Sequence, residues 1–290
     1  MYDLKMYQSI EQVTWCPGCG DFGILAAVKQ ALAQLELAPH HVMFFSGIGC
    51  GSKLPHYLKC NGYDSVHGRA LPVATGFHLV NPDLKVIAVT GDGDGYGIGG
   101  NHFINTARRN VDMVHIVENN QIYALTKGQY SPTSEKGFVT ATTPEGAIEA
   151  AMNPLAMAIA AGATFVARGF SNDVKNLANL VARSISHKGY ALIDVLQPCV
   201  TYNKVNTKEW YKMRLYRVED EADYNPTDKV WAFRKAQEWG QRIPSGVLYE
   251  VSLPTYEDQV RVLEAGPLFK QPLRGPTMGE DFEKTKREFM

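Results

Sequence analysis

The sequence lacks the features that would place a chain in a membrane, on nucleic acid or outside the cell. Its 290 residues carry a formal net charge of −1, so there is no excess of basic residues to attract a polyanion or an anionic lipid surface. No apolar run is long enough to span a bilayer, and residues 1–13 show no signal-peptide h-region. We find no internal repeat and no low-complexity tract. These absences predict a cytoplasmic globular protein that binds neither nucleic acid nor membrane.

Cysteine is scarce, and four of the five cysteines lie in contexts that suggest metal or redox chemistry. Cys16 and Cys19 form a Cys-Pro-Gly-Cys knuckle just before a predicted helix, whose N-terminus would stabilise thiolates. Cys50 and Cys199 each follow directly after a predicted strand. Disulfides are rare in cytosolic proteins, so these spacings favour a metal or redox site. Cys60 follows no strand and is interpreted as a spare residue.

The four cysteines are compatible with more than one group. If the strands before Cys50 and Cys199 are parallel, all four thiols lie at one edge of the sheet, which suits a [4Fe–4S] cluster. Zinc is the competing metal, although a zinc ribbon normally has two close Cys-x-x-Cys knuckles. A thioredoxin-like dithiol would leave Cys50 and Cys199 unexplained, and inert buried cysteines are the simplest alternative. The spacing alone leaves iron–sulfur, zinc and inert cysteines open.

Strand and helix patterns alternate through residues 1–200. Asp21 and Asp173 are expected to cap helices. The patterns predict strands at 42–46, 85–90, 112–118, 164–168 and 190–196, the last strand of the sheet, and helices from 21, at 71–80, 98–109 and 155–161, and from 173 to 187. This alternation predicts an α/β fold with a doubly wound, mainly parallel sheet. Residues 201–290 differ in composition and are expected to form a C-terminal extension that wraps a partner.

The most informative segment runs from the strand at 85–90 into a glycine-rich turn. Gly91-Asp92-Gly93 ends this strand, and Asn119-Asn120 ends the next one. Ligands of parallel sheets lie beyond the carboxyl ends of the strands. Asp92, the Asn120 side chain and the Ile122 carbonyl offer hard oxygen ligands, so the segment predicts a Mg²⁺–diphosphate site.

This pattern of Gly-Asp-Gly followed about one βα unit later by Asn-Asn resembles the thiamine diphosphate-binding motif. A calcium loop starting at Asp92 is the main competitor. It fails, because Tyr96 and Phe103 stand where such a loop needs its third side-chain ligand and its final bidentate Glu. An ordinary glycine-rich turn is the purely structural alternative.

Together, the motif and the four cysteines resemble the β subunit of the 2-oxoacid:ferredoxin oxidoreductases over nearly the whole chain. The matching segments, in order, are residues 15–20, 47–55, 66–76, 91–94, 119–133 and 197–210. The resemblance implies a thiamine diphosphate-binding domain over residues 1–200. It also implies oxidative decarboxylation of a 2-oxoacid to its coenzyme A thioester, or the reverse reductive carboxylation. Electrons would pass through one [4Fe–4S] cluster to ferredoxin.

The resemblance also implies roles for individual residues. The cluster would be ligated by Cys16, Cys19, Cys50 and Cys199, and Mg²⁺ would be held by Asp92, Asn120 and the Ile122 carbonyl. The diphosphate and thiazolium would be lined by Ile48, Gly49, Cys50, Gly51, His67, Gly91, Gly93, Asp94, Ala124 and Leu125. His67 is in addition a candidate catalytic residue.

The resemblance implies partner chains as well. Thiamine enzymes use a carboxylate, generally Glu, on a separate pyrimidine-binding domain, and residues 1–290 have room for only one α/β domain. An α subunit would therefore carry that domain, in a dimer of α–β heterodimers. A C-x₂-C-x₂-C-x₃-C run is absent, so one cluster per chain is expected.

The turn at Leu125-Thr126-Lys127-Gly128-Gln129 bears on the substrate. Relatives that act on pyruvate tend to carry Asn-Thr-Gly there, whereas Lys127 would supply a cation for a distal carboxylate, whose unpaired burial would be costly. Leu125 would leave room for a longer acid. We therefore expect 2-oxoglutarate as the substrate and Lys127 as a catalytic-site residue, with pyruvate or another 2-oxoacid as the alternative.

Two other functions are compatible with parts of the pattern. A non-redox thiamine enzyme would use the cysteines for structural zinc or for nothing. A non-catalytic scaffold subunit would be expected to have lost a magnesium ligand, and the intact Asp92 and Asn120 argue against it.

Overall fold

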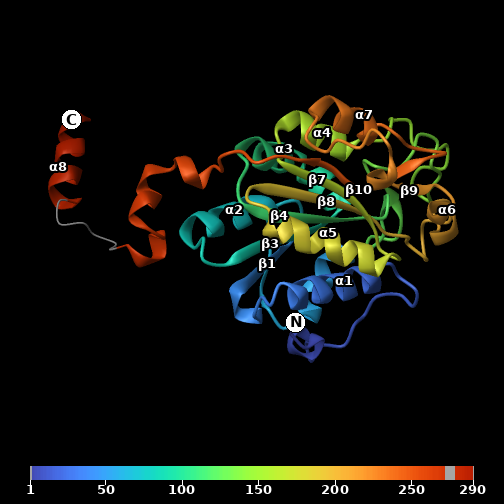
Figure 1. Cartoon of the computed structure of the whole chain (residues 1–290), viewed down its shortest axis with the longest axis horizontal. Coiled ribbons are helices and arrows are strands. Elements are labelled where there is room, and N and C mark those ends of the chain that lie inside the picture. The colour runs from blue at the N-terminus through green and yellow to red at the C-terminus, as the bar shows by residue number, and fades with distance from the viewer. Residues whose placement is uncertain (1, 272–277, 290) are drawn as a thin grey trace.

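The computed structural model describes residues 2–271 and 278–289, and its centre is one eight-stranded sheet (Figure 1). The strands lie in the order β2-β1-β3-β4-β8-β7-β10-β9. Their bounds are β1 Val42–Ser46, β2 Asn61–Asp64, β3 Lys85–Gly91, β4 Met113–Asn119, β7 Phe165–Phe170, β8 Tyr190–Leu196, β9 Leu215–Arg217 and β10 Ile243–Glu250. Neighbours from β2 to β7 pair in parallel. The predicted α/β fold is confirmed.

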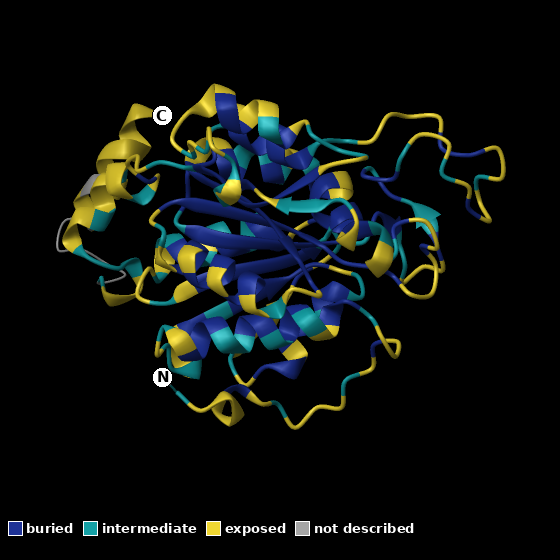
Figure 2. Cartoon of the chain, turned by 45° about the vertical axis from the view of Figure 1, so that its right-hand side comes forward, coloured by how far each residue is buried: buried dark blue, intermediate teal, exposed yellow. Residues whose placement is uncertain are grey.

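Helices cover both faces of the sheet. The helices are α1 Asp21–Gln34, α2 Ala70–Val80, α3 Gly100–Arg109, α4 Pro154–Ala161, α5 Val174–Ser186, α6 Lys208–Lys212, α7 Lys229–Ala236 and α8 Met278–Glu288. One core packs α1 and α5 on one face, and a second core packs α2, α3, α4 and α7 on the other. Figure 2 shows the buried strands between these two layers. In the described ranges, no helix is both long and apolar enough to cross a membrane.

Shorter elements connect the main ones. Short 3₁₀-helical segments are η1 Leu4–Tyr7, η2 Pro39–His41, η3 Gly51–Tyr57, η5 Val218–Asp220, η6 Glu257–Gln259, η7 Arg261–Ala265 and η8 Leu268–Lys270, and a π-helical turn, η4, spans Gly93–Ile98. A small hairpin, β5 Ile122–Tyr123 and β6 Gln129–Tyr130, stands apart from the sheet.

β4 and β8 at the centre are built mainly of apolar residues, and their polar residues are His115, Glu118 and Asn119 in β4 and Asp194 in β8. All seven residues of β4 and of β8 are buried, as expected for parallel strands covered on both faces. Periodicity finds such strands well, and β1 and β8 have the predicted bounds. Asp173 caps α5 as predicted, because its carboxylate accepts a hydrogen bond from the Asn176 amide.

Two expectations about the fold are wrong. The strand at 190–196 is not the last, because β9 and β10 from the segment after residue 200 extend the sheet, with β10 antiparallel to β7. β10 contains Pro244 and Gly246, which weaken the strand signal in its sequence. Its pairing with β7 shifts register near Val247. Asp21 does not cap α1: Gly20 is the N-cap, and Asp21 is fully buried at the first helical position.

The parallel arrangement brings four loops to one edge of the sheet. β1, β3, β4 and β8 are consecutive neighbours, so their carboxyl ends lie side by side. The loop after β1 carries Cys50, the loop after β3 carries Asp92, the loop after β4 carries Asn120, and the loop after β8 carries Cys199. These segments are the ones in which the sequence predicts chemistry.

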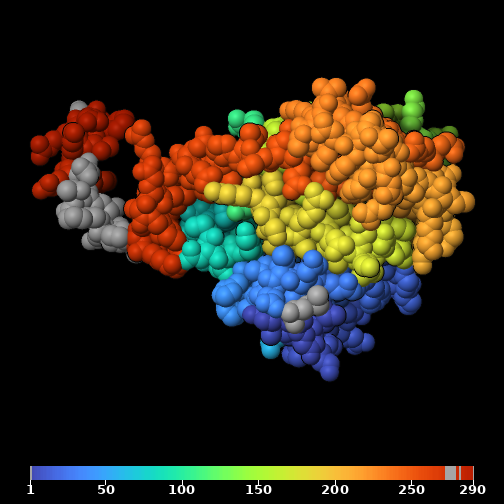
Figure 3. Space-filling model, viewed as in Figure 1, coloured from blue at the N-terminus to red at the C-terminus, as the bar shows by residue number. Residues whose placement is uncertain are grey.

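The C-terminal segment reaches the opposite edge of the sheet, where Glu257 meets His78 and the residue before β4, and it projects from the body at the left of Figure 3. Glu257 of η6 fixes its course. The Glu257 carboxylate accepts hydrogen bonds from His78 at the end of α2 and from the Asp112 amide, each at 2.9 Å. The Glu257 carboxylate is largely buried. Its two hydrogen bonds attach η6 to α2 and to the residue before β4.

Burial by itself would raise the pKa of Glu257, but the His78 and Asp112 hydrogen bonds hold that pKa below its ordinary value of 4.5. We therefore predict that Glu257→Gln weakens the anchoring of η6 by about 1–2 kcal/mol. Trypsin cleavage at Arg261 should then accelerate roughly 5–30-fold. The exposed Glu264→Gln is the matched control.

The same anchor should depend on pH. A carboxylate whose pKa is lower in the folded state contributes stability that is present above the unfolded pKa and is lost as the pH falls through the folded pKa. The difference in amide protection of residues 253–260 between wild type and Glu257→Gln, corrected for intrinsic exchange, should be present at pH 7 and shrink below pH 4.5. A difference that grows on acidification would contradict this account.

Candidate active site

Four cysteines from three separate segments line one pocket. Cys16 and Cys19 before α1, Cys50 after β1 and Cys199 after β8 surround a cavity of about 220 Å³. Its wall also includes Lys53, Asn120, Ala124 and Leu125. The predicted cluster residues therefore adjoin three of the residues that the sequence assigns to a diphosphate site. Cys60 lies elsewhere, among residues 38–40 and 59–61.

Hydrogen-bond donors point at the cysteine sulfurs. Gln197 Nε2 lies 3.2 Å from Cys19 Sγ, and Thr201 Oγ1 lies 3.2 Å from Cys16 Sγ. Burial raises the pKa of the Cys50 thiol to about 11. Such a thiol ionises at neutral pH only if a cation takes the place of its proton. The donors around the sulfurs suit thiolates that are bound to a metal.

A buried pair of carboxyl groups lies beside the cysteines and was missed from sequence. Asp21 of α1 and Glu118 of β4 are both at most 1% exposed. Burial raises the pKa of Glu118, and the neighbouring charge of Asp21 raises it further. Two such carboxyls share a proton more readily than both ionise. The sequence signal was Glu118 in a mainly apolar strand that also contains His115 and Asn119.

Two hydroxyl groups donate hydrogen bonds to the Asp92 carboxylate. Asp92 is 1% exposed, and its Oδ2 accepts hydrogen bonds from Ser131 and Thr133, each at 2.5 Å. Burial raises the pKa of Asp92 to about 6, against the lowering effect of these hydroxyls. A nearby cation would favour the ionised carboxylate. Ser131 and Thr133 were not singled out from the sequence.

Asn120 and Ile122 form a tight turn at the end of β4. Asn120 Oδ1 accepts a hydrogen bond from the Ile122 amide at 3.1 Å, and Gln121 between them has a left-handed φ of 58°. This turn carries the Asn120 side chain to the wall of the cysteine pocket. Asp92 does not line that pocket and lies at the end of the neighbouring strand, β3.

Asp94 ties together three segments that are distant in sequence. Its Oδ1 lies 2.7 Å from the Gly68 amide, 3.2 Å from the Ile48 amide and 2.5 Å from His67 Nδ1. The other oxygen, Oδ2, is buried without a partner among the described residues. A Cβ at Gly47 would lie 1.7 Å from that oxygen, so only glycine fits there. Asp94 thus sets the positions of the predicted diphosphate loops.

The turn between β5 and β6 brings the remaining predicted residues to the same side. Tyr123 donates a hydrogen bond to the Gly93 carbonyl at 2.9 Å, which ties the hairpin to the Gly-Asp-Gly turn. Lys127 is exposed and has a left-handed φ of 79°, a conformation that non-glycine residues rarely adopt. Strain of this kind is more common at functional sites.

Residues 40–195 match the family model for the thiamine pyrophosphate enzyme C-terminal TPP-binding domain, which is more than half of the chain. Residues 199–265 match the model for the C-terminal part of the pyruvate ferredoxin oxidoreductase β chain. Fold and site therefore define a thiamine diphosphate-binding domain.

Curated relatives specify the family. 2-Oxoacid:ferredoxin oxidoreductase 1, subunit beta, of Aeropyrum pernix is 46% identical, with 95% of this chain and 93% of the relative covered. The 2-oxoglutarate oxidoreductase subunit KorB of Mycobacterium tuberculosis is 47% identical, covering 69% of this chain and 53% of that protein. The chain belongs to the β subunits of the 2-oxoacid:ferredoxin oxidoreductases, and as a β subunit it has an α partner.

A solved structure agrees over the whole fold. The 2-oxoglutarate:ferredoxin oxidoreductase from Magnetococcus marinus, with 2-oxoglutarate, coenzyme A and succinyl-CoA bound, has a TM-score of 0.90 and 36% identity. The alignment covers 97% of this chain and 96% of that one. The family resemblance inferred from the motifs is thus confirmed.

We predict that Gly47→Ala lowers the affinity of the α–β complex for thiamine diphosphate at least about tenfold, which is about 1.4 kcal/mol. The added Cβ would displace the Asp94 carboxylate that holds the Ile48 and Gly68 amides. Calorimetric titration of the cofactor measures this. Gly76→Ala in α2 is the control, because a Cβ there meets nothing within 4 Å. Equal affinities for both variants would contradict the role given to Asp94.

Proposed function

We propose that this β subunit takes part in thiamine diphosphate-dependent oxidative decarboxylation of 2-oxoglutarate to succinyl-CoA, or in the reverse carboxylation, with electrons leaving through a [4Fe–4S] cluster to ferredoxin. The observation that carries the proposal is the pocket in which four cysteines adjoin Asn120, Ala124 and Leu125. It would bring a cluster next to the thiamine site. The similarity to 2-oxoglutarate enzymes from two organisms supports the choice of acid.

The donor set at the strand ends fits Mg²⁺ and a diphosphate. Asp92, Asn120 and the Ile122 carbonyl offer oxygen atoms only, which suits a hard cation that keeps phosphate or water ligands as well. Gly93 and Gly49 have no side chains, so the backbone there could approach a diphosphate closely. Asp94 holds the loop of Ile48 by accepting a hydrogen bond from the Ile48 amide. Gly91 and Gly51 are the other two glycines of the proposed diphosphate site. A Cβ at Gly51 would lie 2.2 Å from the Glu118 carboxylate.

The spread of the cysteines favours a cluster over a single zinc ion. A tetrahedral Zn²⁺ site with Zn–S bonds of about 2.3 Å needs sulfurs about 3.8 Å apart. Among the described residues, the one set of three or more metal-ligating atoms within 4.8 Å of one another is His78, Asp112 and Glu257, not the cysteines. The cysteines instead border a cavity of about 220 Å³, which suits a larger group.

When bound, thiamine diphosphate would supply the carbanion and the cluster would accept single electrons. The chain's own residues would orient and shield these groups. Asp94 holds the loops of Ile48 and His67, and His67 is the proposed catalytic residue of this edge. Ser131 and Thr133 fix the Asp92 carboxylate for the metal.

Lys127 is the proposed determinant of acid choice. It is exposed in the isolated β chain, at the tip of the β5–β6 turn beside Leu125. A dicarboxylate held there would pair its distal carboxylate with the ammonium group. Its strained φ of 79° supports a functional reason for lysine at this position.

The proposal extends to the assembly. An α subunit would bring the pyrimidine-binding domain and its Glu, and residues 201–290 would contribute to the contact in a dimer of α–β heterodimers. A cytoplasmic location belongs to the same proposal, because the four cysteines must stay reduced and unpaired in disulfides to ligate a cluster. Ferredoxin would dock where Cys16 is exposed.

We predict about four iron and four sulfide per β chain in the anaerobically purified α–β complex. Cys199→Ser should lose iron and the spectrum of the reduced cluster. Cys60→Ser should keep both, because Cys60 lies outside the pocket. Elemental analysis and electron paramagnetic resonance measure these outcomes. Stoichiometric zinc, or equal iron in the two variants, would refute the cluster assignment.

We predict that Lys127→Ala lowers the ratio of kcat/KM for 2-oxoglutarate to that for pyruvate by about 10–100-fold, which is the loss of one charge pair of about 1.4–2.8 kcal/mol. Lys127→Arg should restore part of the ratio. The nearby exposed Lys136→Ala is the control. A 2-oxoglutarate preference that Lys127→Ala leaves unchanged would exclude Lys127 as its source, and a wild-type preference for pyruvate would overturn the choice of acid.

A further inference from the structure

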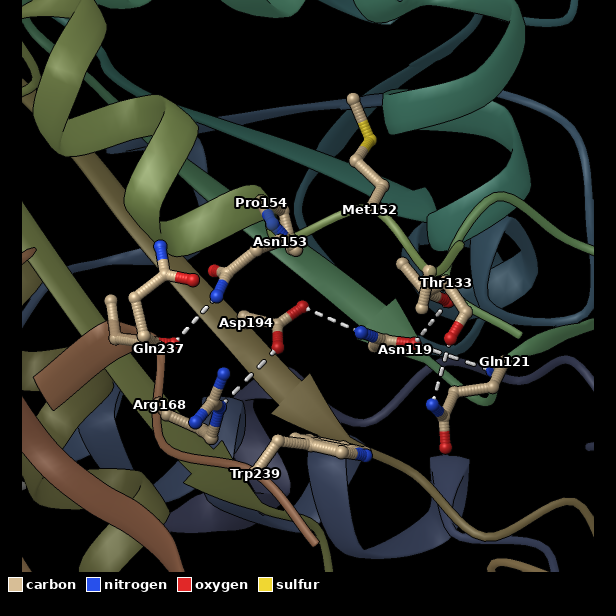
Figure 4. Close-up of a pocket in the computed structure, with 12 residues that line it drawn as sticks. Asn119, Gln121, Thr133, Met152, Asn153, Pro154, Arg168, Asp194, Gln237 and Trp239 are labelled. Atoms are coloured by element: carbon tan, nitrogen blue, oxygen red, sulfur yellow. Dashed lines mark hydrogen bonds and ion pairs between the residues drawn. The ribbon is translucent and has the colours of Figure 1, made fainter. Parts of the chain in front are cut away.

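A second pocket lies beside the proposed cofactor site (Figure 4), with Thr133, whose hydroxyl holds the Asp92 carboxylate, in the wall between them. Its volume is about 240 Å³. It is formed by the ends of β4, β7 and β8, the start of α4 and the segment after α7. The lining residues used below are Asn119, Arg168, Asp194, Gln237 and Trp239.

Arg168 places a cation inside this pocket with most of its hydrogen-bonding capacity unused. Its side chain is 3% exposed. Nε has no hydrogen-bond acceptor among the described residues, and Nη1 reaches only the Pro244 carbonyl, at 3.5 Å. A guanidinium has five N–H donors and is costly to bury when they are unsatisfied.

Asp194 balances the charge of Arg168 but does not satisfy its donors. Arg168 Nε lies 3.8 Å from Asp194 Oδ2, which is an ion pair without a hydrogen bond. Asp194 Oδ1 is already occupied by Asn119 Nδ2 and the Tyr96 hydroxyl. The carboxylate is thus held by its own partners and leaves the guanidinium of Arg168, which lines the cavity, without a hydrogen bond from Asp194.

Trp239 holds the guanidinium in place and closes one side of the pocket. Arg168 Cζ lies 5.5 Å from the centre of the Trp239 ring, a cation–π contact. The indole N–H is taken by Glu135. Gln237 is exposed at the opening, so small molecules have a route from solvent.

We propose that this pocket is a binding site for a small carboxylate, which the Arg168 guanidinium grips with its free N–H groups. The volume equals the space of about eight water molecules, too small for a nucleotide or coenzyme A and sufficient for an acid of a few carbons. A planar carboxylate matches the guanidinium fork. A phosphate dianion fits less well, because Arg168 is the one cation among the described residues that line the pocket, and the carboxylates of Asp194 and Glu135 lie near it.

The proposal is independent of the proposed substrate and cluster, because it rests on residues outside both. The test titrates acetate into the α–β complex by calorimetry and repeats it with acetamide, the neutral analogue, and with inorganic phosphate. Acetate should bind at least tenfold more tightly than either. Binding should quench or shift tryptophan fluorescence in wild type, and that change should be absent in Trp239→Phe.

Arg168→Gln combined with Asp194→Asn is the decisive variant, because it removes the guanidinium without leaving an unpaired buried charge. It should lower acetate affinity at least tenfold, while Arg183→Gln at the surface pair with Glu250 leaves it unchanged. Iron content and thiamine diphosphate binding, measured on the same variants, report folding and the proposed function separately.

Further arms distinguish the source of the acid. Arg168-dependent binding of pyruvate or 2-oxoglutarate would mean that the pocket takes the enzyme's own acids. Binding of acetate and formate alone would mean that it takes an unrelated small acid, and either result supports the site. Equal binding of acetate and acetamide, no detectable binding, or binding unaffected by the double variant would overturn it.

Discussion

The parallel alignment of β1, β3, β4 and β8 is the constraint on which the site depends. Because all four strands run in one direction as neighbours, their carboxyl ends open onto one edge. Reversing any one of them would carry its loop to the far side of the sheet. The cysteine pocket, the Asp92 carboxylate and the Asp94 hub exist together only because this alignment collects segments that lie up to about 180 residues apart in the chain, such as Cys19 and Gln197.

Buried carboxyl groups organise that edge. Asp21, Asp92, Asp94, Glu118 and Asp194 are each at most 2% exposed. Burying so many acids is unfavourable unless hydrogen bonds or cations compensate. Asp92, Asp94 and Asp194 receive their donors from loops and strands that are distant in sequence, so each one fixes backbone around it. Burying these acids lowers the stability of the fold, and the hydrogen bonds that they accept hold the loops of the site in place before any ligand binds.

Much of the fold followed from periodicity, because buried parallel strands are continuous apolar runs. β1 and β8 have the predicted bounds, and the bounds of the other predicted elements shift by at most two residues. β2, β9 and β10 were missed: β2 is short and exposed along its length, and Pro244 and Gly246 interrupt the apolar run of β10. The cap assigned to Asp21 was wrong for a tertiary reason: its carboxylate packs beside Glu118 and the cysteines, which no local pattern reveals. The partners of Asp92, Ser131 and Thr133, were missed because they belong to a loop some forty residues later.

The sequence by itself determined the chemistry that is available. It specified four cysteines in strand-end contexts, an Asp and an Asn after consecutive apolar strands, and glycines where side chains cannot fit. Only the tertiary structure decided which of these groups meet. It brought Asp94 to Ile48 and His67, and it aimed Gln197 and Thr201 at cysteine sulfurs. It also buried the Arg168 guanidinium with an Nε–H group that has no acceptor among the described residues. The physical reason is that periodicity reports whether a residue is buried, whereas burial next to a particular partner depends on strand order and loop path.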